Sequence, residues 1–445
     1  MSDGSWERPL DNNELVVKYV GDLFKPLNKE HWALNIIAEV TIDVVSDEEN
    51  VSALRRAWVQ VRYHHPFIAA SINGDKHAYD VPNGAEIESW VSETFLVHKE
   101  ISVKDFLLTA PFREYSSLHF FPSSSEILMR THHWAIDGIG GFHLMDRLLS
   151  YFSVDDPAPN FGSETAHLAP SYLEAAGLPT TLSSASEAKA QTIVTNYLSK
   201  MPSVGLPAQN FTVPGGTKVV KLASPTSTLS SLLSATRKQN LGLAAAVQSA
   251  IVLATRERAP ATLSKQDFSS VALFNYRKYL KAPYNDSAAW PMGVWMVGVP
   301  FSQPEADFIT TAKNMEDIYG QDMASDRCEA IEWYDGFCAR MVKVLSSPMP
   351  EGVAPPSQPQ LSSIGLVDGL VRIRYDGKRG LDVKSVEPVV DNMAASMAVF
   401  QWSFAGTWYL NGCFNENAYS DADAEAFLKR VKEILFSELG VEEAH

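Results

Sequence analysis

The segment 127–152, ILMRTHHWAIDGIGGFHLMDRLLSYF, constrains the fold more than any other part of the chain. Its apolar start is typical of a buried strand, and from Gly140 onward the apolar residues recur at helical spacing. Two adjacent histidines and an Asp-Gly pair lie between these two patterns. The sequence therefore predicts a strand, a loop and a helix in succession, with ionisable side chains and glycines on the loop.

These loop residues have the properties of a proton-transfer site. His133, at the end of a strand, can present a ring nitrogen to a cleft, and an unperturbed pKa of about 6.5 lets imidazole accept and return a proton near neutral pH. Asp137 can point back into the fold, where its charge needs a cationic partner. The glycines allow a sharp backbone path and leave space beside the histidine. We interpret His133 as a general base on a braced loop.

A metal site formed by His132, His133, Asp137 and His143 is the main alternative. Adjacent histidines on an extended segment face opposite ways, and no second cluster has the spacing of metal ligands, so no metal is expected. A metal-dependent hydrolase remains a lesser hypothesis, which stoichiometric zinc or iron would support. His132 is expected to be structural, and Trp134 is expected to form either a pocket wall or part of the core.

Composition excludes several classes of protein. The chain has 445 residues, 45% of them hydrophobic, which predicts a globular protein with two large domains. A net charge of -16 argues against nucleic acid and anionic membrane partners. The polar N-terminus and the lack of a long apolar run favour a cytoplasmic protein. The three cysteines have no CxxC spacing and are expected to be buried small hydrophobes: Cys328, Cys338 and Cys413.

The remaining pattern mixes helices and strands in both halves of the chain. Turn formers concentrate between about 153 and 218, which predicts an N-terminal lobe (1–180), a crossover linker (181–218) and a C-terminal lobe (219–445). Helices are expected over 46–65, 187–200, 227–240 and 241–259 and after Ser420; strands over 268–280 and 292–301; a hairpin over 370–388; and a strand pair over 397–414.

The motif HHWAIDG resembles the HHxxxDG signature of the condensation-domain and BAHD-like acyltransferase superfamily. Three other segments resemble parts of those proteins: 59–72, the arginine-bearing FNYRKYL, and 404–431, which is similar to the end of fungal secondary-metabolite O-acyltransferases of the trichothecene 15-O-acetyltransferase type. The DFGWG motif of plant members is absent, and 382–392 stands roughly where it is expected.

This resemblance implies an α/β fold of the α+β kind with mixed sheets, arranged as two chloramphenicol acetyltransferase-like lobes with an active-site tunnel between them. It implies transfer of an acyl group from a CoA thioester to an alcohol or amine of a small secondary metabolite, with His133 as the base and no covalent intermediate. It also implies that Asp137 pairs with Arg277 and, with Gly138, supports the catalytic loop. No tightly bound cofactor is expected, and the protein is expected to be a monomer.

Two further groups of residues are candidates for substrate contacts. The oxyanion needs a donor, and four hydroxyls of the C-terminal half are candidates: Ser362, Ser363, Ser396 and Ser403. Four cations on the predicted hairpin could neutralise CoA phosphates, or could equally belong to a solvated sheet face: Arg372, Arg374, Lys378 and Arg379. The alternative function is a condensation-type domain that uses carrier-protein thioesters or serves as a silent docking module.

Overall fold

The computed structural model describes residues 4–43, 46–154, 156–209, 211–320, 327–347 and 355–443, and its chain divides into two compact units. Each unit is assembled from three separate segments. Unit 1 comprises Met1–Thr181, Asn275–Met296 and Val367–Val390, and unit 2 comprises Leu182–Phe274, Val297–Leu366 and Asp391–His445.

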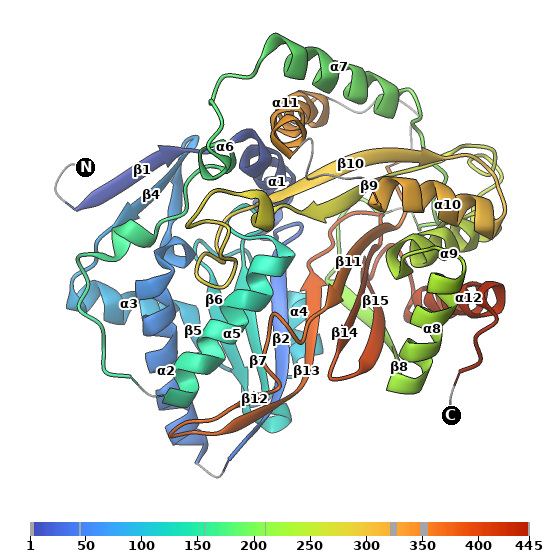
Figure 1. The fold of residues 1–445 in the computed structure, drawn as a ribbon. Coiled ribbons are helices and arrows are strands. Elements are labelled where there is room, and N and C mark those ends of the chain that lie inside the picture. The colour runs from blue at the N-terminus through green and yellow to red at the C-terminus, as the bar shows by residue number, and fades with distance from the viewer. Residues whose placement is uncertain are drawn as a thin grey trace. The chain divides into compact units, whose positions relative to one another are not determined.

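A six-stranded sheet forms the centre of unit 1 (Figure 1). Its neighbouring strands are antiparallel except for β5 and β6, which are parallel. Along the sheet the order is β12 (Arg374–Tyr375), β13 (Leu381–Val390), β2 (Leu34–Ile42), β7 (Glu126–Thr131), β6 (Ser117–Phe121) and β5 (Phe95–Val97). The central strands β2 and β7 are almost continuously buried, as expected for strands covered on both faces.

Helices and a small second sheet complete unit 1. Helix α5 packs on α2 and on strand β2, and Figure 1 shows α2 and α5 side by side. The helices are α1 (Asn12–Asp22), α2 (Asp47–His64), α3 (Gly84–Thr94), α4 (Val103–Thr109), α5 (Gly138–Val154) and α6 (Tyr172–Ala176). The second sheet has the order β1 (Ser5–Pro9), β4 (Lys76–Asp80) and β3 (Ser71–Asn73). Unit 1 also contains short 3-10 turns at Lys25–Leu27, Pro66–Ala69, Pro122–Ser124, Glu164–His167 and Arg277–Tyr279.

Unit 2 contains a four-stranded sheet and a two-stranded one. The larger sheet has the order β11 (Gln360–Leu366), β14 (Ala398–Phe404), β15 (Thr407–Asn415), β8 (Thr217–Ser224), with β11 parallel to β14 and the rest antiparallel. Strands β9 (Phe268–Asn275) and β10 (Met296–Gln303) form the smaller sheet. The helices are α7 (Ser184–Leu198), α8 (Thr226–Lys238), α9 (Leu243–Arg258), α10 (Phe308–Tyr319), α11 (Arg327–Leu345) and α12 (Asp421–Leu439).

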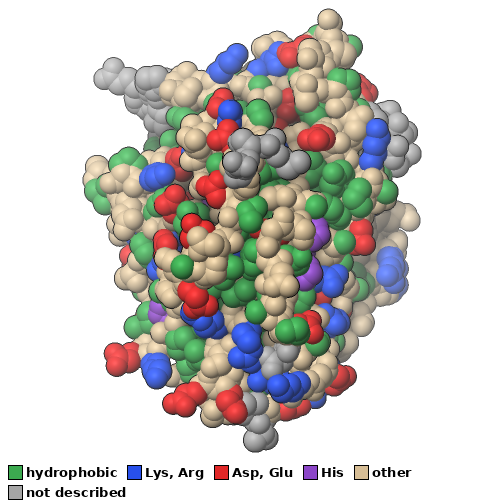
Figure 2. Space-filling model, turned by 90° about the vertical axis from the view of Figure 1, so that its left-hand side faces the viewer, with side chains coloured by type: hydrophobic (Ala, Val, Ile, Leu, Met, Phe, Trp, Pro, Cys, Tyr) green, Lys and Arg blue, Asp and Glu red, His purple; other side chains and the backbone are tan. Residues whose placement is uncertain are grey.

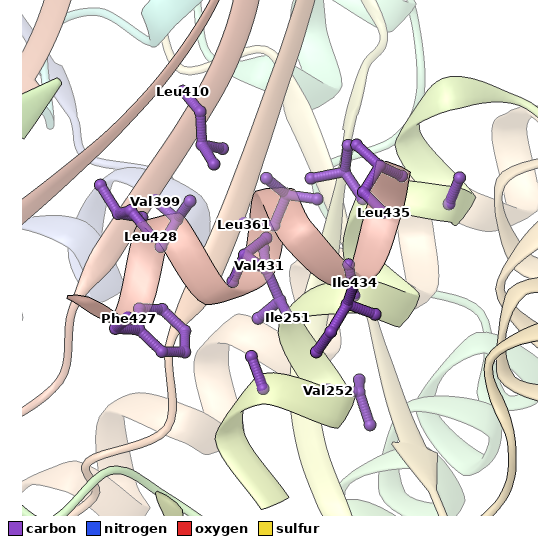
Figure 3. Packing of buried hydrophobic residues seen from close by; sticks show 14 of the residues in the cluster. Ile251, Val252, Leu361, Val399, Leu410, Phe427, Leu428, Val431, Ile434 and Leu435 are labelled. Carbon is purple, nitrogen blue, oxygen red and sulfur yellow. The ribbon is translucent and has the colours of Figure 1, made fainter. Parts of the chain in front are cut away.

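The core of unit 2 lies between one face of the four-stranded sheet and helices α9 and α12 (Figure 3). Apolar residues of α12 recur three or four positions apart and meet side chains from α9 and from the sheet. Burial of each such side chain stabilises the fold by about 1.5–3 kcal/mol. The residues labelled in the figure are Ile251, Val252, Leu361, Val399, Leu410, Phe427, Leu428, Val431, Ile434 and Leu435.

Most of the predicted elements are present. The helix expected over 46–65 is α2, and its capping box of Ser46 and Glu49 is formed. Helices α7, α8, α9 and α12, the hairpin of β12 and β13, and the pair of β14 and β15 also lie where they were expected. Cys338 and Cys413 are buried as predicted, whereas the side chain of Cys328 lies outside the described residues.

Two strand predictions are too long and are corrected. The strand expected over 268–280 ends at Asn275, because the side-chain oxygen of Asn275 accepts a hydrogen bond from the Arg277 N–H (3.1 Å) and turns the chain into a 3-10 turn. The strand expected over 292–301 begins only at Met296, because the preceding residues pair with the HHWAIDG loop instead.

The division into units also differs from a split into continuous lobes. Segments 275–296 and 367–390 belong to unit 1, although the sequence places them after the predicted linker. The physical cause is strand pairing, since β13 hydrogen-bonds to β2 over nine pairs of residues, from Leu381↔Ile42 to Val390↔Leu34.

On the face drawn in Figure 2, Lys and Arg side chains lie among Asp and Glu side chains rather than forming one continuous basic area. None of the helices in the described ranges combines the length and the apolar character that crossing a bilayer requires.

Candidate active site

The HHWAIDG residues lie on the connection between β7 and α5. His132 follows the strand directly, residues 133–135 form a turn, and Gly138 begins the helix. The turn is closed by a hydrogen bond from the Ala135 N–H to the His132 carbonyl (3.0 Å). The predicted order of strand, loop and helix is therefore confirmed.

Asp137 is held by Arg277 and by two backbone N–H groups. Nη1 of Arg277 donates to both carboxylate oxygens, and both side chains are enclosed within unit 1. The carboxylate also accepts hydrogen bonds from the N–H of Gly140 (3.0 Å), in the first turn of α5, and from that of Trp295 (2.9 Å). A buried carboxylate is costly unless it is paired and fully hydrogen-bonded, and this one is both.

Segment 291–295 is a second support that sequence reasoning missed. The Gly293 N–H donates to the Ala135 carbonyl (2.8 Å), and the Gly293 carbonyl accepts from the Asp137 N–H (3.3 Å). Nη2 of Arg277 donates to the carbonyls of Pro291 (2.9 Å) and Gly293 (3.1 Å). The segment thereby pairs with the loop and ties it to Arg277. The only local signal was a glycine at the start of the predicted strand, Gly293, which has a positive φ of 109°.

Glycines in the first turn of α5 allow these close approaches. A Cβ at Gly140 would lie 2.1 Å from the Pro291 carbonyl oxygen and 2.7 Å from Nη2 of Arg277. A Cβ at Gly141 would meet Ile36 at 3.0 Å. Side chains at these positions would push the helix away from Arg277 and from strand β2.

His133 is partly exposed, and its two ring nitrogens differ. Nδ1 is shielded from solvent and has no well-aligned partner among the described residues, whereas Nε2 is not enclosed and makes no hydrogen bond to any of them. Enclosure lowers the pKa of His133, while backbone groups of His133 and Ile136 and the charges of Asp137 and Glu30 act in the opposite direction. A neutral imidazole with an accessible Nε2 can accept a proton.

His132 is anchored on both sides, in agreement with a structural role. Its Nδ1 lies 2.9 and 3.0 Å from the two oxygens of Glu30, and its Nε2 lies 3.0 Å from the carbonyl of Glu114. Both ring nitrogens therefore lie within hydrogen-bond distance of an acceptor, which fixes the orientation of the ring. No local pattern indicated Glu30, which lies about a hundred residues earlier in the chain.

Trp134 lies between two buried histidines. Its ring stacks on His132 with centroids 4.8 Å apart and faces His77 at 5.2 Å. His77 in turn lies 3.1 Å from Glu14, which is also bound by Arg8. This packing places Trp134 in the core of unit 1, the second of the two roles expected for it.

The four candidate oxyanion serines lie in unit 2 and differ in orientation. Ser363 and Ser403 are on the helix-covered face of the sheet: the Ser363 hydroxyl accepts a hydrogen bond from Gln401 (2.7 Å), and Ser403 is paired with Trp408. Ser362 is one position away from Ser363 on β11 and so faces the opposite side. Ser396 lies in the bend before β14.

The arginines of the β12–β13 hairpin are paired with acidic side chains. Arg372 binds Asp146 through Nε (2.9 Å) and Nη2 (3.0 Å). Arg374 makes ion pairs with three carboxylates: Asp43, Asp376 and Asp382.

Lys378 and Arg379 occupy the turn of the same hairpin. Lys378 is exposed and Arg379 partly exposed, and the Arg379 N–H donates to the Ser153 carbonyl (3.1 Å). Since the neighbouring arginines are already neutralised, the hairpin fits a solvated sheet face better than a phosphate-binding patch.

His143, the remaining residue of the metal alternative, is buried in α5. Burial lowers its pKa to about 4, and the nearby charge of Arg277 acts in the same direction. Across the described residues, no group of three or more His, Cys, Asp or Glu side chains is arranged to hold a metal ion.

The chain is similar along its whole length to fungal acetyltransferases. It is 28% identical over 454 residues to acetyltransferase pigO of Monascus ruber, with 99% of this chain and 98% of that protein covered. It is also 28% identical to O-acetyltransferase pigM of the same fungus, covering 99% of this chain and 86% of the relative. No protein-family model matches the chain.

Solved structures show the same fold. Trichothecene 15-O-acetyltransferase from Fusarium sporotrichioides superposes with a TM-score of 0.80 at 16% identity, covering 98% of this chain and 96% of that one. The first condensation domain of the calcium-dependent antibiotic synthetase superposes with a TM-score of 0.66 at 14% identity, covering 99% and 98%. The predicted superfamily resemblance, mixed α/β fold and acyltransferase class are thus confirmed.

Proposed function

We propose that this acyltransferase moves an acyl group from a CoA thioester to a hydroxyl or amine of a small secondary metabolite, with His133 as the general base. The observation that carries the proposal is the loop of His133. Its backbone is tied to Asp137, Arg277 and segment 291–295, while Nε2 of His133 is left accessible and without a hydrogen bond to any described residue. That is the arrangement that a positioned base requires.

The reaction balances with one histidine. Nε2 of His133 takes the proton of the acceptor O–H or N–H as that oxygen or nitrogen attacks the thioester carbonyl. The tetrahedral intermediate then collapses, the C–S bond breaks, and the imidazolium returns the proton to the departing thiolate. The ester or amide and the free thiol are the products, and no acyl-enzyme forms.

The oxyanion of the intermediate needs a hydrogen-bond donor. Of the four candidate serines, Ser363 already bonds to Gln401 and Ser403 faces the helical core of unit 2, so these two are the weaker candidates. The names of the two Monascus relatives support acetyl as the transferred group. Acyl-CoA is a substrate in this proposal, with no resident cofactor.

The test is a pair of variants assayed with acetyl-CoA and a panel of alcohols and amines, with release of thiol and product mass as readouts. His133→Ala should lose at least about a hundredfold in kcat and keep its thermal unfolding temperature, because it removes only proton transfer. Asp137→Ala should lose both activity and soluble protein, because Arg277 would remain buried without its partner.

His167→Ala serves as the matched control, since His167 is a partly exposed histidine of unit 1 outside the loop. Normal turnover by His133→Ala would refute the assigned base. An intact mass increased by an acetyl group after incubation with acetyl-CoA alone would refute the direct mechanism. Turnover with carrier-bound thioesters but not with acetyl-CoA would instead indicate a condensation-type enzyme.

A further inference from the structure

Trp32 has an unusual backbone conformation next to the proposed active-site loop. Its φ is 63°, in the left-handed region that bulky side chains rarely adopt. Within the described ranges, the other non-glycine residues with positive φ are small or are asparagines: Asn28, Ser125, Asn240 and Ala405. Backbone strain of this kind persists only where the surroundings enforce it, and it concentrates at functional sites.

The residues around Trp32 fix this conformation from both sides. Glu30 is bound to Nδ1 of His132, and the His31 N–H donates to the Gly21 carbonyl (3.1 Å). Strand β2 begins two residues after Trp32, at Leu34, which pairs with Thr131 at the end of β7. The segment that carries Trp32 is therefore attached to the same strand and the same histidine pair as His133.

The indole of Trp32 lies beside His133 and is only partly covered. The ring centroids of Trp32 and His133 are 6.5 Å apart, with an angle of 55° between the rings. The ring of His31 stacks on Trp32 at 5.1 Å. The indole remains partly exposed, and within the described part of the chain its N–H has no acceptor. Aromatic surface and an unused donor are thus available close to the base.

We propose that Trp32 determines acceptor specificity by stacking on a flat, conjugated ring system that carries the reacting hydroxyl or amine. This inference rests on the proposed function and names the acceptor class. An indole face attracts π systems through offset or edge-to-face packing. The adenine ring of CoA is a less suitable stacking partner for Trp32, which lies beside His133. The whole flexible pantetheine chain separates that ring from the reacting thioester.

The experiment compares Trp32→Phe and Trp32→Leu on two alcohols that differ only in their ring, 2-naphthalenemethanol and its saturated decalin analogue, with acetyl-CoA as donor. Trp32→Leu keeps an apolar side chain but removes the π face. It should lower kcat/KM for the naphthalene alcohol about two- to tenfold through KM, with little change for the decalin alcohol or in KM for acetyl-CoA. Trp32→Phe should retain most of the preference.

Trp6→Leu is the matched control, because Trp6 is a partly exposed tryptophan of unit 1 on strand β1. If Trp32→Leu folds poorly, Trp32→Asn replaces it, since asparagine tolerates the left-handed region. An equal loss for both alcohols, or a change in KM for acetyl-CoA alone, would overturn the inference.

Calorimetric titration of each variant with 2-naphthalenemethanol separates this inference from the proposed reaction. Weaker binding to Trp32→Leu than to wild type and Trp6→Leu supports the aromatic contact even if no acyl transfer occurs. Transfer to the naphthalene alcohol that depends on His133 but not on Trp32 would retain the proposed function and refute the role of Trp32.

Discussion

The imidazole of His133 is subject to opposing influences. Enclosure lowers its pKa, because removal from water disfavours the charged ring, while the carboxylates of Asp137 and Glu30 favour that charge. The first influence prevails, so the pKa lies below the ordinary value of about 6.5. The ring is consequently neutral at pH 7, which is the form a general base must have.

This direction predicts the acid side of the pH profile. Because the base acts when neutral, kcat/KM should stay level above its pKa and fall as the pH drops through it, so the acid limb should lie below pH ~6.5. Glu30→Gln removes a charge that raises the pKa of His133, so it should move the limb to still lower pH. Initial rates between pH 5 and 8 measure this, and a wild-type limb above pH ~6.5 would contradict it.

Single residues also show how far the sequence was informative. His133 and Asp137 could be selected because they belong to one short pattern between a strand and a helix. Glu30 and Trp32 could not, because their relation to His133 depends on the register of β2 with β7. No local property of the sequence determines that register. Glu30 is distinguished by the contact of its carboxylate with Nδ1 of His132, and Trp32 by its backbone φ angle, and both features exist only in the folded chain.

At the scale of elements, the loop between β7 and α5 is stabilised mainly by a segment distant in sequence. Residues 291–295 supply backbone partners to Ala135, Asp137 and Arg277. The strand predicted to include most of these residues was too long. An apolar sequence pattern is the same whether the residues hydrogen-bond to a neighbouring strand or to a loop. By contrast, helices with a cap and a clear apolar face were predicted correctly, as α2 and α12 show.

A methyl group at Gly140 should disrupt this assembly. In Gly140→Ala the new Cβ would lie 2.1 Å from the Pro291 carbonyl oxygen, and such overpacking costs about 1–3 kcal/mol or more. Thermal unfolding should show lower stability, and activity should fall because the loop moves relative to Arg277. Gly84→Ala, at the start of α3 with nothing within 4 Å, should be stabilised by about 0.4–1 kcal/mol. Equal stability of the two variants would contradict the close packing of Gly140 against Pro291 and Arg277.

At the scale of the whole molecule, each compact unit is built from chain segments that lie far apart in the sequence. Strand β13 completes the large sheet of unit 1, and segment 275–296 delivers Arg277 to Asp137 within the same unit. Turn-rich stretches led to the prediction that the chain crosses once between lobes, over 181–218. They could not show that it crosses again, because the later crossings lie in ordinary strands such as β9 and β10.

The buried histidines of unit 1 predict how stability depends on pH. Burial lowers the pKa of His31 and of His65 to about 3 and that of His143 to about 4. The unfolded chain binds these protons near pH 6.5 and the folded chain does not. Stability is therefore retained above pH ~6.5 and lost on acidification, by about 1.4 kcal/mol per histidine and pH unit. Asp11 opposes this, because its pKa is raised to about 7.

Among these four groups the three histidines outweigh the aspartate, so together they should lower the free energy of unfolding by roughly 3 kcal/mol per pH unit between pH 6.5 and 5. Urea unfolding at several pH values measures this slope. Acidification also reduces the repulsion among the excess carboxylates of this chain, which opposes the loss of stability. The contribution of a single histidine is therefore isolated by comparing the pH slopes of wild type and His65→Leu. Replacing this buried ring removes one proton-linked group and should flatten the slope by about 1.4 kcal/mol per pH unit. An unchanged slope would mean that His65 takes up its proton in the folded protein.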